Sequence, residues 1–138
     1  MLIVACNRVT DLTPIASLEH LEYLEIFSNR VTDLTPLTGL THLVDLNIAY
    51  NAITDYEPLK QMTWLRRLWL FKGSTYAKGY SLTDEVVASL REALPDTHID
   101  ASSQPTLGGW REDAHYDAVH ESFYSGVYQP FADSWTED

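Results

Sequence analysis

The sequence contains one cysteine in 138 residues, Cys6, so no disulfide can form within the chain. It has no apolar run close to the roughly 20 residues that a membrane-spanning helix needs. It also has no HExxH, CxxC or nucleophile-elbow motif, which are the short signatures of common metal and catalytic sites. These absences argue against a membrane-spanning protein, a disulfide-rich domain and a motif-defined enzyme, and nothing in the pattern predicts a cofactor. The length fits one domain.

Basic residues are also scarce, with nine Lys and Arg against twenty Asp and Glu. The imbalance is uneven: residues 1–80 carry eight acids and seven bases, whereas residues 81–138 carry twelve acids and two bases, so their net charges are −1 and −10. A strongly acidic half repels phosphate backbones. The charge pattern therefore argues against nucleic acid as a partner.

A repeat of 22 residues dominates what the chain does contain. Asn7, Asn29 and Asn51 mark its period, within the frame L-x-x-L-x-L-x-x-N-x-I/V-T-D-x-x-P-L/I. The L-x-L core alternates at period two, as a short strand does when every second side chain points inward. Because one copy cannot bury its apolar side alone, copies at this period pack against their neighbours as a solenoid with parallel strands.

The other repeated positions predict the remaining parts of each copy. The asparagine amides follow the strands, where they can bond to the backbone of the turn and form a structural ladder. The Thr-Asp pairs and the prolines recur at the same 22-residue spacing. They predict turns and short 3₁₀ helices on the convex side. The aspartate column has two interpretations, turn capping or a ladder of metal ligands. One aspartate in each copy is poor coordination for a metal ion, so we favour turn capping.

The repeats resemble the 22-residue leucine-rich repeats of internalin-like and phosphatase-regulator-type proteins. The segments that carry the resemblance are NRVTDLTPIASL, NRVTDLTPLTGL and NAITDYEPLKQM. It implies an α/β fold, a right-handed leucine-rich-repeat solenoid with a parallel β-sheet on the concave side. It also implies a bacterial, non-catalytic binding module that holds a protein ligand on the concave face.

Three regions follow from this pattern. Residues 1–73 hold about three and a half repeats, and residues 74–101 form a C-terminal cap of loop, helix and last strand. The cap helix begins at Ser81 or Thr83 and stops before Pro95. Residues 102–138 form an acidic, aromatic tail with a short helix from Asp113 to about residue 123, and we expect this tail to pack on the cap.

The strand register places several aromatic and charged side chains on the outward, concave face. Large aromatic residues and arginine are enriched where protein interfaces bind most tightly. We therefore predict a protein ligand at this face, although the tail or a second copy of the chain could cover it instead. The predicted ligand-binding residues are Tyr23, Glu25, Phe27, Asp45, Asn47, Tyr50, Arg67, Trp69 and Phe71.

Two other functions remain open on the sequence. The chain could be a structural repeat segment of a larger surface protein. A metal-dependent enzyme is the less favoured alternative, and it would use the acidic and histidine side chains of the tail helix. We interpret these side chains instead as a solvated helix face. Those residues are Asp113, His115, Asp117, His120 and Glu121.

The first turn of the solenoid has no capping segment before it in this sequence. Its apolar positions would then have nothing packed beneath them, and open ends of this kind invite association. We therefore predict a homodimer through this end. The start MLIVAC fits the repeat register better than a signal peptide, which would make the protein cytoplasmic by default, or exposed on the surface or secreted if a segment precedes it. The apolar positions are Leu2, Val4, Val9, Leu12, Ile15 and Leu18.

Overall fold

A computed structural model describes residues 1–70, 82–101 and 114–127, with side chains from residue 117 onward in the last of these segments. The chain divides into two compact units, Met1–Ser103 and Gln104–Asp138. The first unit contains the repeats and the cap. The second contains helix α2 (Ala114–Ser125), and each unit is described by itself.

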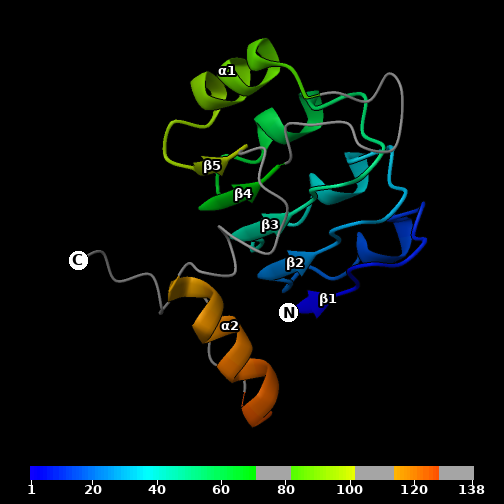
Figure 1. The fold of residues 1–138 in the computed structure, drawn as a ribbon, viewed down its shortest axis with the longest axis vertical. Coiled ribbons are helices and arrows are strands. Elements are labelled where there is room, and N and C mark those ends of the chain that lie inside the picture. Colours follow the sequence, from blue (N-terminus) through cyan, green and yellow to red (C-terminus); the bar gives the residue numbers. More distant parts are fainter. Residues whose placement is uncertain (71–81, 102–113, 128–138) are drawn as a thin grey trace. The chain divides into compact units, whose positions relative to one another are not determined.

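A five-stranded parallel sheet runs through the first unit in simple sequence order, β1-β2-β3-β4-β5 (Figure 1). Leu2 pairs with Leu24, Leu24 with Leu46 and Leu46 with Leu68, so the register follows the 22-residue repeat. This confirms the predicted solenoid with parallel strands. The strands are β1 (Leu2–Ile3), β2 (Tyr23–Glu25), β3 (Asp45–Asn47), β4 (Arg67–Trp69) and β5 (His98–Asp100).

The repeated apolar columns form one core between the sheet and the convex side. Leu24, Leu46 and Leu68 are fully buried. Three 3₁₀ helices form the convex side, each with a proline in its first positions, and proline suits that place because its φ is already helical. They are η1 (Thr13–Ile15), η2 (Thr35–Leu37) and η3 (Glu57–Gln61).

The predicted asparagine ladder joins each copy to the one before it. Asn29 donates from Nδ2 to the carbonyl of Val4, at 2.9 Å, and accepts at Oδ1 from the N–H of Val9, also at 2.9 Å. Asn51 repeats both bonds one copy later, with the carbonyl of Ile26 and the N–H of Val31. The amides therefore satisfy backbone groups that would otherwise be buried without partners.

Asn7 occupies the same position in the first copy but is exposed, and it donates to the carbonyls of Val4 and Ala5 in its own turn. The first turn is otherwise partly covered. Leu12 is 2% exposed, so the prediction that nothing covers this residue is wrong, whereas Leu18 is 42% exposed.

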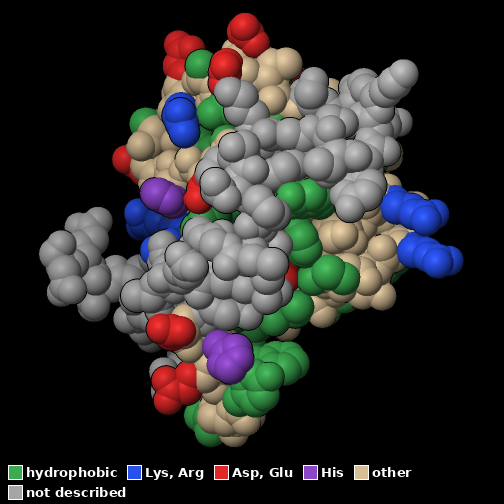
Figure 2. Space-filling model, viewed as in Figure 1, with side chains coloured by type: hydrophobic (Ala, Val, Ile, Leu, Met, Phe, Trp, Pro, Cys, Tyr) green, Lys and Arg blue, Asp and Glu red, His purple; other side chains and the backbone are tan. Residues whose placement is uncertain are grey.

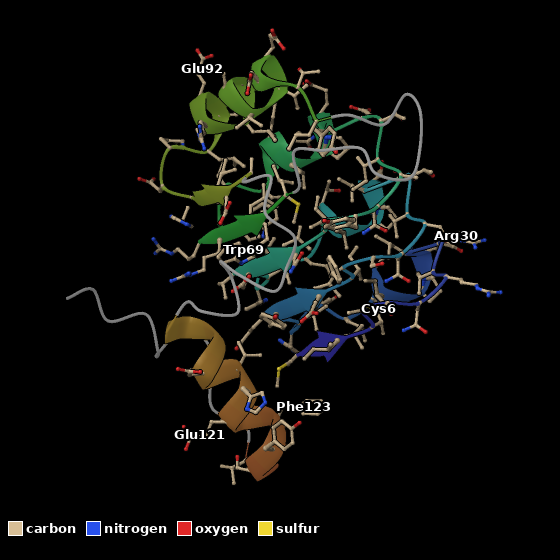
Figure 3. All side chains as sticks on the ribbon, in the orientation of Figure 1. Cys6, Arg30, Trp69, Glu92, Glu121 and Phe123 are labelled. Carbon is tan, nitrogen blue, oxygen red and sulfur yellow. The ribbon has the colours of Figure 1, made fainter. Side chains whose placement is uncertain are left out.

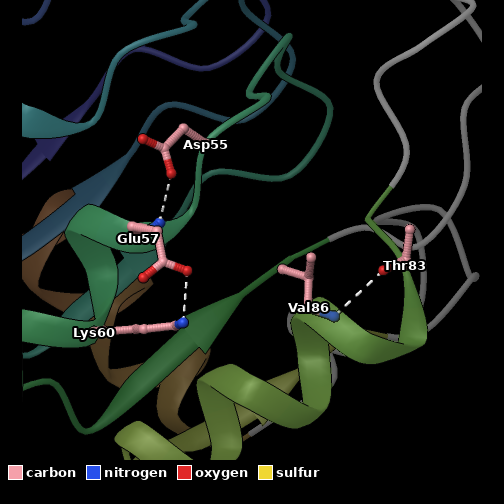
Figure 4. Close-up of polar contacts among 5 residues, drawn as sticks. All are labelled: Asp55, Glu57, Lys60, Thr83 and Val86. Atoms are coloured by element: carbon pink, nitrogen blue, oxygen red, sulfur yellow. Dashed lines mark hydrogen bonds and ion pairs between the residues drawn. The ribbon is translucent and has the colours of Figure 1, made fainter.

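The aspartate column caps the turns, as predicted. Asp11, Asp33 and Asp55 each accept at Oδ1 from the backbone N–H two residues later, at 2.8–2.9 Å, and Figure 4 shows this bond for Asp55. Two hydrogen bonds from Thr13 lower the pKa of Asp11. The bond from the Thr13 hydroxyl has the larger effect, and the bond from its backbone N–H has the smaller one. Thr35 lowers the pKa of Asp33 in the same way, against smaller opposing effects of desolvation and the nearby Asp11 charge.

These two lowered pKa values predict an acid-dependent part of the stability. Each aspartate has a lower pKa in the folded chain than in the unfolded chain, so its contribution is present above the unfolded value of about 4 and is lost as the pH falls through the folded value. We expect Asp11→Asn/Asp33→Asn to lose less free energy of unfolding than the wild type between pH 6 and pH 3 in urea titrations. Glu92→Gln, an exposed change on the cap, is the control. Equal losses in all three proteins would contradict the assignment.

One residue per copy adopts a left-handed backbone where the chain leaves the strand. Cys6, Ser28 and Tyr50 have φ of 56°, 54° and 57°. A side chain costs roughly 1–2 kcal/mol in this region, whereas glycine enters it freely. We expect Ser28→Gly to raise the free energy of unfolding by about 0.5–1 kcal/mol, and Ser89→Gly, inside helix α1 (Asp84–Ala93), to lower it by about as much. Thermal unfolding checks both, and a destabilising Ser28→Gly would show that the strain is absent.

Helix α1 and strand β5 close the far end of the repeats (Figure 1). The Thr83 hydroxyl accepts from the N–H of Val86, so the helix begins at one of the two predicted caps (Figure 4). The Thr97 hydroxyl donates to the carbonyl of Leu65 at 2.8 Å and ties the cap to the last repeat. The predicted cap helix and last strand are therefore both present.

Candidate functional site

The sheet face consists of the outward side chains of the five strands. The register brings Asp45 between Tyr23 and Arg67, and Asn47 between Glu25 and Trp69. Strand β5 extends both rows, which sequence reasoning missed, because the predicted last strand had not been placed in register with the repeats. The two full rows are Tyr23, Asp45, Arg67 and His98, and Ile3, Glu25, Asn47, Trp69 and Asp100.

Most of the predicted binding residues on this face are buried. The sequence favoured an open surface for a ligand and left open that the tail or a second copy covers it. The register could not decide between these, because it determines only which face a side chain joins. What covers that face depends on the packing of the whole chain. The exposed fractions are 2% for Tyr23, 3% for Glu25, 1% for Asp45, 0% for Asn47 and 6% for Trp69.

Polar contacts hold the middle of the face. The Tyr23 hydroxyl donates to Oε2 of Glu25 at 3.1 Å. Asn47 accepts at Oδ1 from the N–H of Ala49, also at 3.1 Å, so this side chain has a structural role as well. Its Nδ2 is buried and has no hydrogen-bond partner within residues 1–70, 82–101 and 114–127. Buried donors are normally paired, so the bonding of this amide is incomplete.

The margin of the sheet face is more accessible than its middle. Phe27 and Tyr50 are half-buried and lie edge to face, with ring centroids 5.2 Å apart. Arg67 is half-buried and His98 is exposed, and the His98 ring lies 6.0 Å from that of Trp69. Phe71, the last predicted site residue, lies outside the described residues.

The alternative metal site falls partly outside the described part of the chain. Asp113 and the side chain of His115 are not described, and Asp117, His120 and Glu121 are exposed on α2. Among the described residues, no group of three or more His, Cys, Asp or Glu side chains could hold a metal ion. Helices in the described segments are too short or too polar to cross a membrane.

Comparison with known proteins identifies a matching family and similar solved structures, among them two internalins. The leucine-rich-repeat family model matches residues 17–34 and 39–55. An internalin from Listeria monocytogenes, inlF, is 26% identical, with 72% of this chain and 26% of that chain covered and a TM-score of 0.52. Internalin C2 from the same organism is 29% identical, with coverages of 73% and 44% and a TM-score of 0.48. No curated protein matches.

The chain spans about a quarter of the length of the first internalin. The matched segments lie within the predicted repeats of residues 1–73, and the parallel sheet has the register that this repeat requires. The leucine-rich-repeat fold is generally a non-enzymatic recognition fold. The bacterial origin stays a prediction. The protein is a leucine-rich-repeat protein with internalin-like repeats.

Proposed function

We propose that this chain is a non-catalytic protein-recognition module whose sheet face binds a protein ligand. The observation that carries the proposal is the juxtaposition of aromatic and charged side chains along one face of a parallel sheet. Phe27 and Tyr50 offer a paired aromatic surface, and Arg67 is a fork of donors for partner carboxylates.

The margin is where we expect a partner to make first contact. The middle of the face is buried, so a ligand reaches the half-buried Phe27, Tyr50 and Arg67 before it reaches Trp69. Figure 3 shows Trp69 in the sheet and Arg30 on the other side of the repeat unit, which makes Arg30 a suitable control position. Aromatic and arginine anchors commonly contribute the largest share of binding free energy.

The test uses the full chain as bait in an extract of the source organism, followed by purification of the captured protein and titration calorimetry. We expect Phe27→Ala/Arg67→Ala to weaken binding at least about tenfold, since each anchor is typically worth more than about 1 kcal/mol. Arg30→Ala removes a cation elsewhere and should leave the affinity unchanged. Equal affinity of all three proteins would refute the sheet face as the site.

We also propose, for the 138-residue chain, a homodimer through the first turn of the solenoid. Its support is an open cavity of about 470 Å³ next to the edge strand β1, with the exposed Leu18 in its wall. Strand edges with free backbone groups pair readily. The cavity is lined by Met1, Leu2, Ser17, Leu18, Glu19, His20 and Leu21.

Light scattering tests the dimer, with Leu18→Asp as the variant, because Leu18 is exposed and its replacement leaves the core intact. We expect the mass of a dimer for the wild type and the mass of a monomer for the variant. The two proteins should have the same circular dichroism spectrum. A monomeric wild type at high concentration contradicts the dimer. If it also binds no partner, the alternative of a structural repeat segment gains support. The metal-dependent enzyme remains the less favoured alternative.

A further inference from the structure

Helix α2 presents an apolar surface that neither the repeats nor the proposed binding face explains. Phe123, Tyr124 and Val127 are 62%, 75% and 59% exposed, and they are three of the five exposed large hydrophobic residues in the described segments. Val119, one turn earlier, is 1% exposed. Exposed aromatic clusters of this kind mark interaction sites.

The cluster has a defined geometry at the end of the helix. The rings of Phe123 and Tyr124 lie 5.8 Å apart, edge to face, and the ring of His120 lies 4.3 Å from that of Tyr124. Gly126 has a φ of +66°, and the N–H of Val127 bonds to the Ser125 hydroxyl at 3.2 Å. A glycine in this conformation ends a helix and turns the chain, which brings the residue after it back toward the last turn.

The charges around the cluster restrict what can bind it. Asp117 and Glu121 are exposed on the same helix, and Figure 3 shows Glu121 and Phe123 projecting from α2. Residues 112–138 contain seven acids and no lysine or arginine. Figure 2 shows hydrophobic, acidic and histidine side chains together on the surface of α2. Such a surface repels a second copy of itself, an anionic membrane and nucleic acid.

We propose that α2 is a docking helix for a partner protein that has an apolar groove bordered by basic side chains. In this mode a helix inserts apolar anchors into the groove, and here the anchors would be Phe123 and Tyr124 in the last turn of α2. Asp117 and Glu121 would face the basic rim. This surface is different from the sheet face, so a result for one site neither supports nor contradicts the proposal for the other.

The experiment introduces a photoreactive residue at Ser125, which is exposed beside the cluster, in the full chain. Proteins cross-linked in an extract of the source organism are identified, purified and titrated against the full chain. We expect Phe123→Ala/Tyr124→Ala to weaken binding roughly tenfold or more. Asp117→Asn/Glu121→Gln should weaken binding at low salt and have little effect at high salt, because salt screens exposed charges.

Asp96→Asn, an exposed change on the cap and outside the cluster, serves as the control and should bind as the wild type does. Circular dichroism confirms that the helix persists in each variant. Four results overturn the proposal: cross-links only within the chain, a dimer that Phe123→Ala/Tyr124→Ala dissociates, binding to phosphatidylcholine vesicles, or a captured partner whose affinity the variants do not change. The first would support the tail packing on its own cap.

Discussion

Replacing Asn29 with alanine is expected to lower the free energy of unfolding by about 3 kcal/mol. The change removes the bonds to the carbonyl of Val4 and the N–H of Val9. It leaves the Val9 N–H without its partner, and the Val4 carbonyl keeps only the bond from Asn7. Each buried group left unpaired costs about 1–3 kcal/mol. Asn51→Ala should cost a similar amount, because it breaks the same two bonds one copy later.

Asn7→Ala is the matched control, since Asn7 is exposed and bonds only within its own turn. We expect it to cost less than about 1 kcal/mol. Urea unfolding followed by circular dichroism measures all three variants. If Asn7→Ala proves as costly as Asn29→Ala, the bonds between copies are not the reason that the asparagine recurs, and its role lies within each turn.

Replacing Leu40 with alanine is expected to cost about 3 kcal/mol, within the 2–5 kcal/mol typical of such changes in a packed core. Leu40 is fully buried between the sheet and the 3₁₀ helices. Because protein stabilities are usually about 5–15 kcal/mol, this one change would remove a large part of the total. The loss should appear as a lower denaturant midpoint with an unchanged slope.

Leu18 occupies the same repeat position one copy earlier but is 42% exposed. Leu18→Ala therefore makes the same chemical change with much less loss of buried area, and we expect a cost of about 1 kcal/mol or less. Equal costs at the two positions would mean that Leu18 is covered in solution, as it would be in the proposed dimer. Repeating the measurement at several protein concentrations separates these cases, since a dimer gains stability with concentration.

The repeat predicted the fold well because each of its signals has a local physical cause. A slip of one residue would turn Leu24 and Leu46 out of the core, so the alternation of the L-x-L segment fixes the strand register. The roles of Asn29 and Asp33 follow from the turn chemistry of their side chains. The left-handed conformation at Ser28 was missed, although its place directly after each strand is a usable signal.

The candidate site was less predictable than the fold. The register correctly placed Tyr23, Asp45 and Trp69 on the outward rows, but it did not predict that they would be buried. Exposure depends on every segment that packs over a face, and the repeat carries no information about that packing. The aromatic end of α2 was predicted as apolar, but its exposure was not, because a face defined by helical periodicity needs a partner surface before it is buried.

The ladder bonds that join neighbouring copies span sequence separations of 20 or 25 residues. The conformational entropy lost in closing a loop depends on the length of the loop. Because these loops have the same length in every copy, each added copy loses the same small amount of entropy as the one before. A chain with this contact pattern can grow from any folded pair of copies by repeated addition. Its folding rate should therefore depend little on how many copies it has. The exposed first turn, where Asn7 donates to Val4 and Ala5 of its own turn, should exchange its amide hydrogens first.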